Sequence, residues 1–129
     1  MQSTEQKIER AALAGLAAAS MDERERSTDI SLAELAALVE TAGGQPVVTL
    51  LQNKPTPDPR TFLGEGKVAE LKELILANDC DLAVFDNELS PSQMRVLEEE
   101  LGVRVLDRSG LILDIFAPVS YTHLTLPTK

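Results

Sequence analysis

The residues best suited to anion chemistry lie in a glycine-rich turn and in three polar segments that follow apolar runs. Gly64-Glu65-Gly66-Lys67 opens a predicted helix, and the free N–H groups at the start of a helix can hold an anion. The three polar segments are 52–67, 86–92 and 107–110. They supply the candidate residues for one anion-binding or interaction surface: Arg60, Gly64, Gly66, Lys67, Asp86, Ser90, Asp107 and Arg108.

The nucleotide-binding motifs that this turn resembles are incomplete. A phosphate loop needs a first glycine, four residues, and then Gly-Lys followed by a hydroxyl residue that holds magnesium. Alignment on Gly66-Lys67 places Thr61 and Val68 at the two outer positions, so the motif fails at both. A guanine-reading Asn-Lys-x-Asp fails at Thr56, and the dinucleotide fingerprint G-x-G-x-x-G does not occur. The sequence therefore predicts no GTP-binding residue in this chain.

Metal binding and nucleophilic catalysis are equally unsupported. Cys80 is the single cysteine and His123 the single histidine, which excludes an internal disulfide and a cysteine-based zinc site. A Ser-His-Asp arrangement would have to use His123, which stands apart in the C-terminal tail. We expect Cys80 to be a small buried hydrophobe. No catalytic residue, metal or cofactor is predicted for this chain alone.

Three helices are predicted to position the candidate residues, at about 31–43, 66–77 and 90–102. Ser31 with Glu34 three residues later suggests a capping box at the start of the first helix. Ser90 and Gln93 form the same pattern at the third, with Pro91 at the first helical position. Apolar residues recur at helical spacing within each segment, so each helix should bury one face.

Short apolar runs at 46–51, 81–85 and 103–106 alternate with these helices and read as strands. Continuous apolarity is typical of parallel strands covered on both faces. The segment 10–19 is ambiguous, because its alanines favour a helix while its position suits a first strand. Residues 21–29 are expected to form an exposed charged loop. The predicted fold class is α/β, a βαβ-type, mostly parallel four-stranded sheet with flanking helices, whose candidate residues share the carboxyl edge of the strands.

Composition narrows the location and the partners of the protein. The 129 residues are 43% hydrophobic and carry a formal net charge of −9, from 21 acidic and 12 basic residues. The polar N-terminus does not resemble a signal peptide, and no apolar run reaches the roughly 18 residues of a membrane span. Acidic domains repel phosphate backbones. We therefore expect a cytoplasmic protein that binds neither membrane nor free DNA.

Four ordered blocks then carry a family resemblance: Thr-Ala-Gly-Gly at 41–44, Pro-Asp-Pro-Arg-Thr-Phe-Leu-Gly-Glu-Gly-Lys at 57–67, Phe-Asp-Asn-Glu-Leu-Ser-Pro-Ser-Gln at 85–93, and Val-Leu-Asp-Arg-Ser-Gly-Leu-Ile-Leu-Asp-Ile-Phe-Ala at 105–117. The stretch 34–117 resembles the N-terminal domain of the HflX family of ribosome-associated GTPases. The resemblance implies a strand at 10–16 and a parent with a helical hairpin and a GTPase domain. GTP and Mg²⁺ would belong to that parent, and its partner would be the large ribosomal subunit.

The same resemblance divides the chain into three segments. Residues 1–9 are an N-terminal extension, 10–117 the family domain, and 118–129 a non-family tail. Pro118 interrupts a helix expected to begin near Leu111, so we interpret the tail as foreign translated sequence. The leading hypothesis is a domain that positions or regulates the missing GTPase domain and contributes to contact with the large subunit. The alternative is a free-standing module that binds a small phosphorylated ligand at the carboxyl edge of its sheet.

Overall fold

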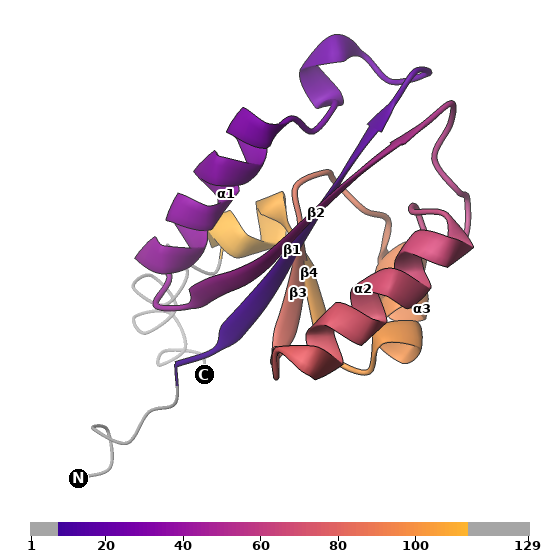
Figure 1. Cartoon of the computed structure of the whole chain (residues 1–129). Coiled ribbons are helices and arrows are strands. Elements are labelled where there is room, and N and C mark those ends of the chain that lie inside the picture. The colour runs from indigo at the N-terminus through magenta and orange to yellow at the C-terminus, as the bar shows by residue number, and fades with distance from the viewer. Residues whose placement is uncertain (1–7, 114–129) are drawn as a thin grey trace, which may run out of the picture.

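A computed structural model describes residues 8–113, which form a four-stranded parallel sheet with helices on both faces (Figure 1). One turn of 3-10 helix follows the first strand, and residues 108–113 are helical after the last. The elements in chain order are β1 (Arg10–Ala18), η2 (Glu23–Glu25), α1 (Asp29–Thr41), β2 (Gln45–Lys54), α2 (Glu65–Ala77), β3 (Leu82–Phe85), α3 (Pro91–Leu101) and β4 (Arg104–Asp107).

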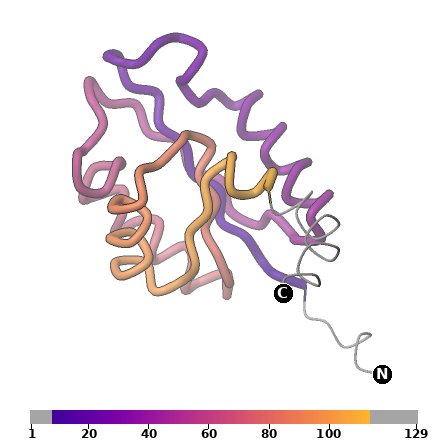
Figure 2. Tube along the Cα trace, turned by 180° about the vertical axis from the view of Figure 1, so that it is seen from behind, coloured from indigo at the N-terminus to yellow at the C-terminus, as the bar shows by residue number. Residues whose placement is uncertain are grey.

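The strands lie in the order β2-β1-β3-β4, and every neighbouring pair is parallel. The chain moves from β1 to one side through α1, and then returns through α2 to β3 on the other side of β1. Consequently α1 covers one face of the sheet, and α2 and α3 cover the other (Figures 1 and 2). The predicted α/β fold class is confirmed, and the ambiguous segment after Arg10 is the central strand.

The core consists of two apolar layers, one on each face of the sheet. Ala11 and Leu13 of β1 face α1, together with Leu32 and Leu35 of that helix. The alternate residues of β1 face α2 and α3, where Phe85 is fully buried. Because alternate side chains of a strand point to opposite faces, the apolar run of β1 supplies both layers. The alanines keep the helices close to the sheet, which suits a chain with few aromatic residues.

The predicted start of α1 is wrong by three residues. Thr28, not Ser31, is the N-cap, with an extended backbone (φ −136°, ψ 172°). The N–H of Ser31 donates to Thr28 Oγ1 at 3.0 Å, and the N–H of Thr28 donates to Ser31 Oγ at 2.7 Å. Ser31 therefore fills the third helical position, usually taken by Glu or Gln in a capping box. At α3 the predicted cap is confirmed, with the N–H of Gln93 donating to Ser90 Oγ at 3.2 Å.

Other boundaries shift by one to three residues. β2 runs on to Lys54, and α2 begins at Glu65 with Gly64 as its N-cap. The predicted exposed loop contains η2 and ends in Ser27, which is 2% exposed. The last helix begins at residue 108, directly after β4, rather than near Leu111. Its predicted interruption at Pro118 lies outside the described residues.

No helix within residues 8–113 combines the length and apolarity needed to cross a membrane.

Candidate functional site

A hollow of about 580 Å³ lies at the carboxyl edge of the sheet, among the loops that follow the strands. It occupies the switch point between β1 and β3, where ligands of open α/β sheets usually bind. Two of the eight predicted residues, Asp86 and Arg108, line this carboxyl-edge hollow. Its other lining residues are Met21, Arg24, Glu25, Arg26, Ser31, Glu34, Pro57, Phe62, Asn87 and Glu88.

Asp86 and Arg108 are bonded to each other and to the start of α1. Arg108 Nε donates to Asp86 Oδ1 at 3.0 Å, and its Nη2 donates to the Ser31 carbonyl at 3.0 Å. Ser31 Oγ donates to Asp86 Oδ2 at 2.6 Å. The Asp86 side chain is 4% exposed and that of Arg108 is 30% exposed. This edge network joins the ends of β3 and β4 to α1, and it uses the charges of both residues internally.

Asp107 caps the helix that begins with Arg108. Its side chain is buried, and Oδ2 accepts the N–H of Leu89 at 3.1 Å. Its Oδ1 accepts the N–H of Gly110 at 2.8 Å, the geometry of a helix N-cap. Asp107 thus starts the helix at 108–113 and ties the β3–α3 loop to β4. Its carboxylate is part of the scaffold and does not line the hollow.

Asn87 fastens the loop after β3 to the end of β1. Its Oδ1 accepts the N–H of Leu16 at 2.9 Å, and its Nδ2 donates to the Leu16 carbonyl at 3.1 Å. The same amide accepts from Ser27 Oγ at 3.0 Å and donates to the Glu25 carbonyl at 2.9 Å. β3 ends at Phe85, so the Asn87 side chain supplies the bonds that another strand residue would make to Leu16. It also holds the loop that forms one wall of the hollow.

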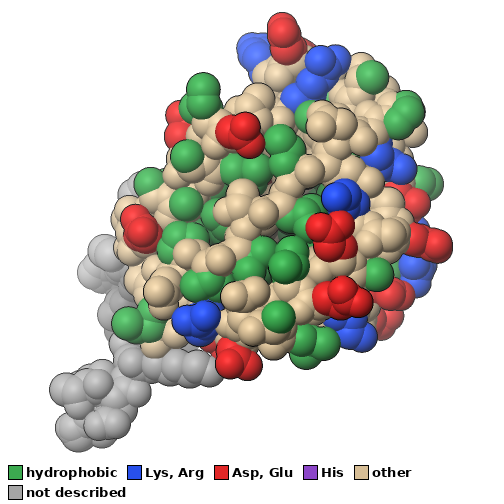
Figure 3. Space-filling view, in the orientation of Figure 1, with side chains coloured by type: hydrophobic (Ala, Val, Ile, Leu, Met, Phe, Trp, Pro, Cys, Tyr) green, Lys and Arg blue, Asp and Glu red, His purple; other side chains and the backbone are tan. Residues whose placement is uncertain are grey.

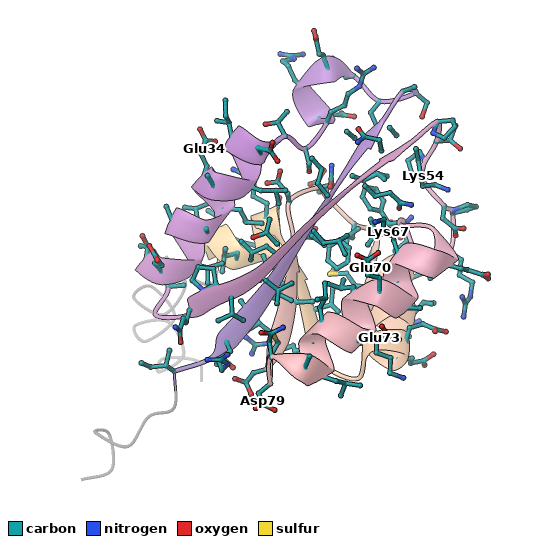
Figure 4. The ribbon with its side chains drawn as sticks, viewed as in Figure 1. Glu34, Lys54, Lys67, Glu70, Glu73 and Asp79 are labelled. Carbon is teal, nitrogen blue, oxygen red and sulfur yellow. The ribbon has the colours of Figure 1, made fainter. Side chains whose placement is uncertain are left out.

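Arg60 and Lys67 lie away from the carboxyl-edge hollow. Arg60 pairs with Glu100 at 3.0 Å and lines a second hollow of about 370 Å³ beside α2 and α3. Lys67 pairs with Glu70 at 3.0 Å on the exposed face of α2 (Figure 4). The candidate residues therefore divide between separate surfaces of the domain.

The glycine turn and Ser90 serve the starts of helices. The N–H of Gly64 donates to Gln52 Oε1 at 2.9 Å, and its carbonyl accepts the N–H of Val68. Gly66 has open space around it, and Ser90 caps α3. The Gly64 N–H that an anion at this turn would use is already bonded to a side chain.

The loop between β2 and α2 is held by an aspartate turn. Asp58 Oδ1 accepts the N–H groups of Arg60 at 2.8 Å and Thr61 at 3.1 Å. These two bonds, chiefly that from Thr61, lower the pKa of the Asp58 carboxyl below its ordinary value. The turn presents Phe62, which is 5% exposed and has φ of 69°. A bulky residue in this left-handed region is strained, and Phe62 lines the hollow.

The charges of the hollow do not form a phosphate cradle. Of its three arginines, Arg108 is paired with Asp86, Arg26 donates to the carbonyls of Met21 at 3.2 Å and Ala19 at 3.0 Å, and Arg24 is 90% exposed and lies 3.9 Å from Asp22. Glu25, Glu34 and Glu88 add negative charge to the same lining. In the described part of the chain, no three His, Cys, Asp or Glu side chains are grouped to hold a metal ion. The residues present do not fit GTP and Mg²⁺, and we assign them no step in GTP hydrolysis.

Asn87, Ser27 and Gly15 belong to this edge but were missed by motif searching. An ideal Cβ on Gly15 would lie 2.4 Å from Ser27 Oγ, so the serine can approach only a glycine. The sequence did offer a signal for Asn87, since it is a polar residue two positions after the apolar strand that ends at Phe85. Ser27 carried no signal, since it lies within a segment, 22–29, that is mostly charged and exposed.

The strand order and the hollow at the switch point define a doubly wound α/β domain. The family model described as GTP-binding GTPase N-terminal matches residues 29–117. The chain belongs to this family, as the N-terminal domain found in GTPases named HflX.

Two curated relatives illustrate the match. The chain is 48% identical over 87 residues to the GTPase HflX of Alkalihalophilus pseudofirmus, covering 67% of this chain and 21% of that protein. It is 42% identical over 92 residues to the GTPase HflX of Escherichia coli, covering 71% and 22%. The chain thus spans about a fifth of the length of these relatives.

Solved structures share the fold. A GTP-binding protein from Sulfolobus solfataricus in complex with GDP superposes with a TM-score of 0.61 at 22% identity, covering 85% of this chain and 30% of that one. A complex of SsGBP with GDP gives a TM-score of 0.63 at 23% identity, covering 86% and 29%. At these identities the likeness concerns the fold alone.

Proposed function

We propose that this chain is the docking and positioning domain of a GTPase that binds the large ribosomal subunit. In this proposal the rest of the parent protein binds GTP and Mg²⁺ and carries out hydrolysis in the cytoplasm. The domain itself holds the GTPase domain in place or regulates it, and adds to the contact with the ribosome. Membership of the GTP-binding GTPase N-terminal family supports the link to a parent GTPase.

The observation that carries the docking role is the edge network of Ser31, Asp86 and Arg108. Its charged atoms bond to one another, with Arg108 bridging α1 and the end of β3. A site for a small anion needs cationic groups that are free to meet it. A bonded network instead gives a fixed shape, which suits recognition by another folded domain.

Exposed apolar side chains near this network supply a contact for a partner domain. Leu113 follows Arg108 in the same helix and is 67% exposed, and Ile30 at the start of α1 is 74% exposed. Apolar side chains of this size are covered when a neighbouring domain packs on them. The net charge of −9 favours contact with protein over direct contact with ribosomal RNA.

A chimera tests this proposal. Residues 8–113 would replace the matching segment of the Escherichia coli relative, and the chimera would be assayed for GTP hydrolysis and for co-sedimentation with large subunits. We expect Leu113→Asp to lower at least one of these several-fold, because it places a charge in the domain contact. Leu76→Asp is the matched control, since Leu76 is equally exposed at 67% but lies on α2. Equal behaviour of both variants would contradict the docking role of this edge.

The alternative function, binding of a small phosphorylated ligand, rests on the volume of the carboxyl-edge hollow. Its disadvantage is that Gly64, Gly66 and Lys67 lie elsewhere and Arg108 is already paired. Thermal unfolding of the chain with millimolar inorganic phosphate or a nucleoside monophosphate separates the two functions. A ligand that binds the native state raises Tm, whereas the docking function predicts no change beyond that given by sulfate at equal ionic strength.

A further inference from the structure

β2 is a long edge strand, and no other strand of residues 8–113 pairs with its outer side. It spans ten residues, Gln45–Lys54, whereas β4 at the opposite margin spans four. Within residues 8–113 only β1 pairs with β2. Edge strands present a row of unpaired N–H and C=O groups that can template another strand. Figure 1 shows β2 at the front of the sheet, between α1 and α2.

The hydrogen-bond pattern identifies the residues that face outward. The carbonyl of Lys54 accepts the N–H of Ala19, so Lys54 is directed toward β1. Bonding direction alternates along a strand, and Thr49, Leu51 and Asn53 therefore direct their N–H and C=O groups away from β1. Pro46 has no N–H, and a register shift follows it. The open segment is thus 47–53, which we call the β2 edge.

The β2 edge lacks the features that usually prevent strand pairing. Its sequence, Val-Val-Thr-Leu-Leu-Gln-Asn, contains no charge in a chain that is 26% charged. Natural edges are commonly protected by lysines, prolines, bulges or short length; here Pro46 and the register shift after it stand at one end, and Lys54 and Pro55 at the other, which leaves the residues between them unprotected. Figure 3 shows hydrophobic side chains gathered on this face of the molecule, over β2 and the adjoining flanks of the helices.

The flanks of α1 and α2 that lie next to the β2 edge determine what could pack beside it. Ser31 and Glu40 mark opposite flanks of α1, and Ser31 contacts Asp86 on the β3 side. The flank toward β2 therefore carries Ala33 and Ala36, whose small side chains allow close approach. On the other face of the sheet, α2 presents Lys67, Glu70 and Glu73 beside the edge (Figure 4).

We propose that the β2 edge pairs antiparallel with the β2 edge of a second copy of this chain. A two-fold axis perpendicular to the sheet, near Leu50, would set Thr49 opposite Leu51 of the other copy. Such an isologous contact is self-complementary, as closed dimers require. It would extend the sheet from four strands to eight and place like helices side by side on each face.

Charge on α2 favours a second copy over an unrelated strand. The N–H of Gly64 bonds to Gln52, which sets the start of α2 level with that residue. With rises of about 3.3 Å per strand residue and 1.5 Å per helix residue, the level of Leu50 falls between Val68 and Ala69 of α2. The two-fold axis then brings Lys67 of each copy beside Glu70 of the other. Because Lys67 and Glu70 are 3.0 Å apart within each copy, the four side chains would form one cluster of alternating charge.

Sedimentation equilibrium of the full chain between about 10 and 500 µM tests the pairing. We expect a concentration-dependent dimer. Lys67→Glu or Glu70→Lys should each weaken it about tenfold, because each replaces two attractive contacts per dimer by repulsion. The double exchange should restore it, since the pairs reform with reversed sign. Lys72→Glu is the matched control, because Lys72 lies on the opposite flank of α2, beside Arg60.

A backbone variant tests the strand contact separately. Thr49→Pro removes one outward N–H and should abolish the dimer while circular dichroism stays that of the native fold, because edge strands tolerate proline. A chain that remains monomeric at 500 µM would overturn the proposal. So would a double charge exchange that fails to restore association, which would indicate that another surface, or another extended polypeptide, is involved.

Discussion

The Asp86 carboxylate shows how single residues define the carboxyl edge. Its side chain is 4% exposed and is bonded by Arg108 and Ser31. A carboxylate removed from water needs hydrogen-bond donors in place of the lost hydration. The arginine and the hydroxyl provide such donors here. Two residues that the sequence suggested for anion binding or interaction, Asp86 and Arg108, therefore hold three elements together.

Arg108→Ala should lower the free energy of unfolding by about 2–4 kcal/mol, because it leaves the buried Asp86 without its cationic partner. Arg108→Lys should lose less, since it keeps the charge but not the bond to the Ser31 carbonyl. Urea denaturation followed by circular dichroism measures both. Arg24→Ala is the control, as Arg24 is 90% exposed and its contact with Asp22 is 3.9 Å long. Equal losses for Arg108 and Arg24 would contradict the role of the edge network.

Asp58 should make the stability of the loop before α2 sensitive to acid. The N–H groups of Thr61 and Arg60 lower the Asp58 pKa in the folded state. A lowered pKa means that the native form binds fewer protons than the unfolded form. The stabilisation is complete above about pH 5 and is lost as the pH falls through the lowered value, below about 4. Asp58→Asn should flatten this part of the stability curve between pH 5 and 3, measured by urea denaturation at each pH, and an unchanged curve would contradict the assignment.

At the scale of elements, the central strand determines the arrangement of the others. β1 is buried on both faces, pairs with β2 and β3, and receives the Asn87 amide where β3 has ended. Gly15 of β1 packs directly against the side chain of Ser27. The packing of Ser27 against β1 therefore requires a residue without a side chain at position 15.

Gly15→Ala should destabilise the domain by about 3 kcal/mol or more, since its Cβ would overlap Ser27. Adding Ser27→Gly removes the atoms that the new methyl group would meet. The double variant should then be less destabilised than the sum of the two single variants, which thermal unfolding of all three can establish. Additive losses would indicate that the overlap is relieved elsewhere.

The sequence predicted the elements better than the contacts between them. Alternating apolar runs and helical periodicity were sufficient for the parallel sheet, and the Ser90 cap was recognisable because its bonds are local. The α1 start was misjudged because Thr28 and Ser31 are both good caps, and tertiary packing decides between them. The division of Arg60, Lys67 and Arg108 among separate surfaces depends on loop paths, which local patterns do not specify. Asn87 and Ser27 contact each other across 60 residues.

At the scale of the whole molecule, the chain corresponds to a small part of its relatives. The family model matches residues 29–117, and the chain spans about a fifth of the length of its curated relatives. The docking role proposed for the carboxyl edge therefore concerns one domain of a longer protein, and the chimera with the Escherichia coli relative measures that role in the setting of the whole GTPase.

The central position of β1 also has a consequence for synthesis on the ribosome. Asn87 lies 71 residues after the Leu16 backbone that it completes. At translation speeds of about 5–20 residues per second, β1 is outside the exit tunnel for several seconds before β3 is made. During that interval its apolar run lacks the neighbour that buries one of its sides. Nascent chains of this domain should therefore need a chaperone, or the shelter of α1 and β2, until the second half emerges.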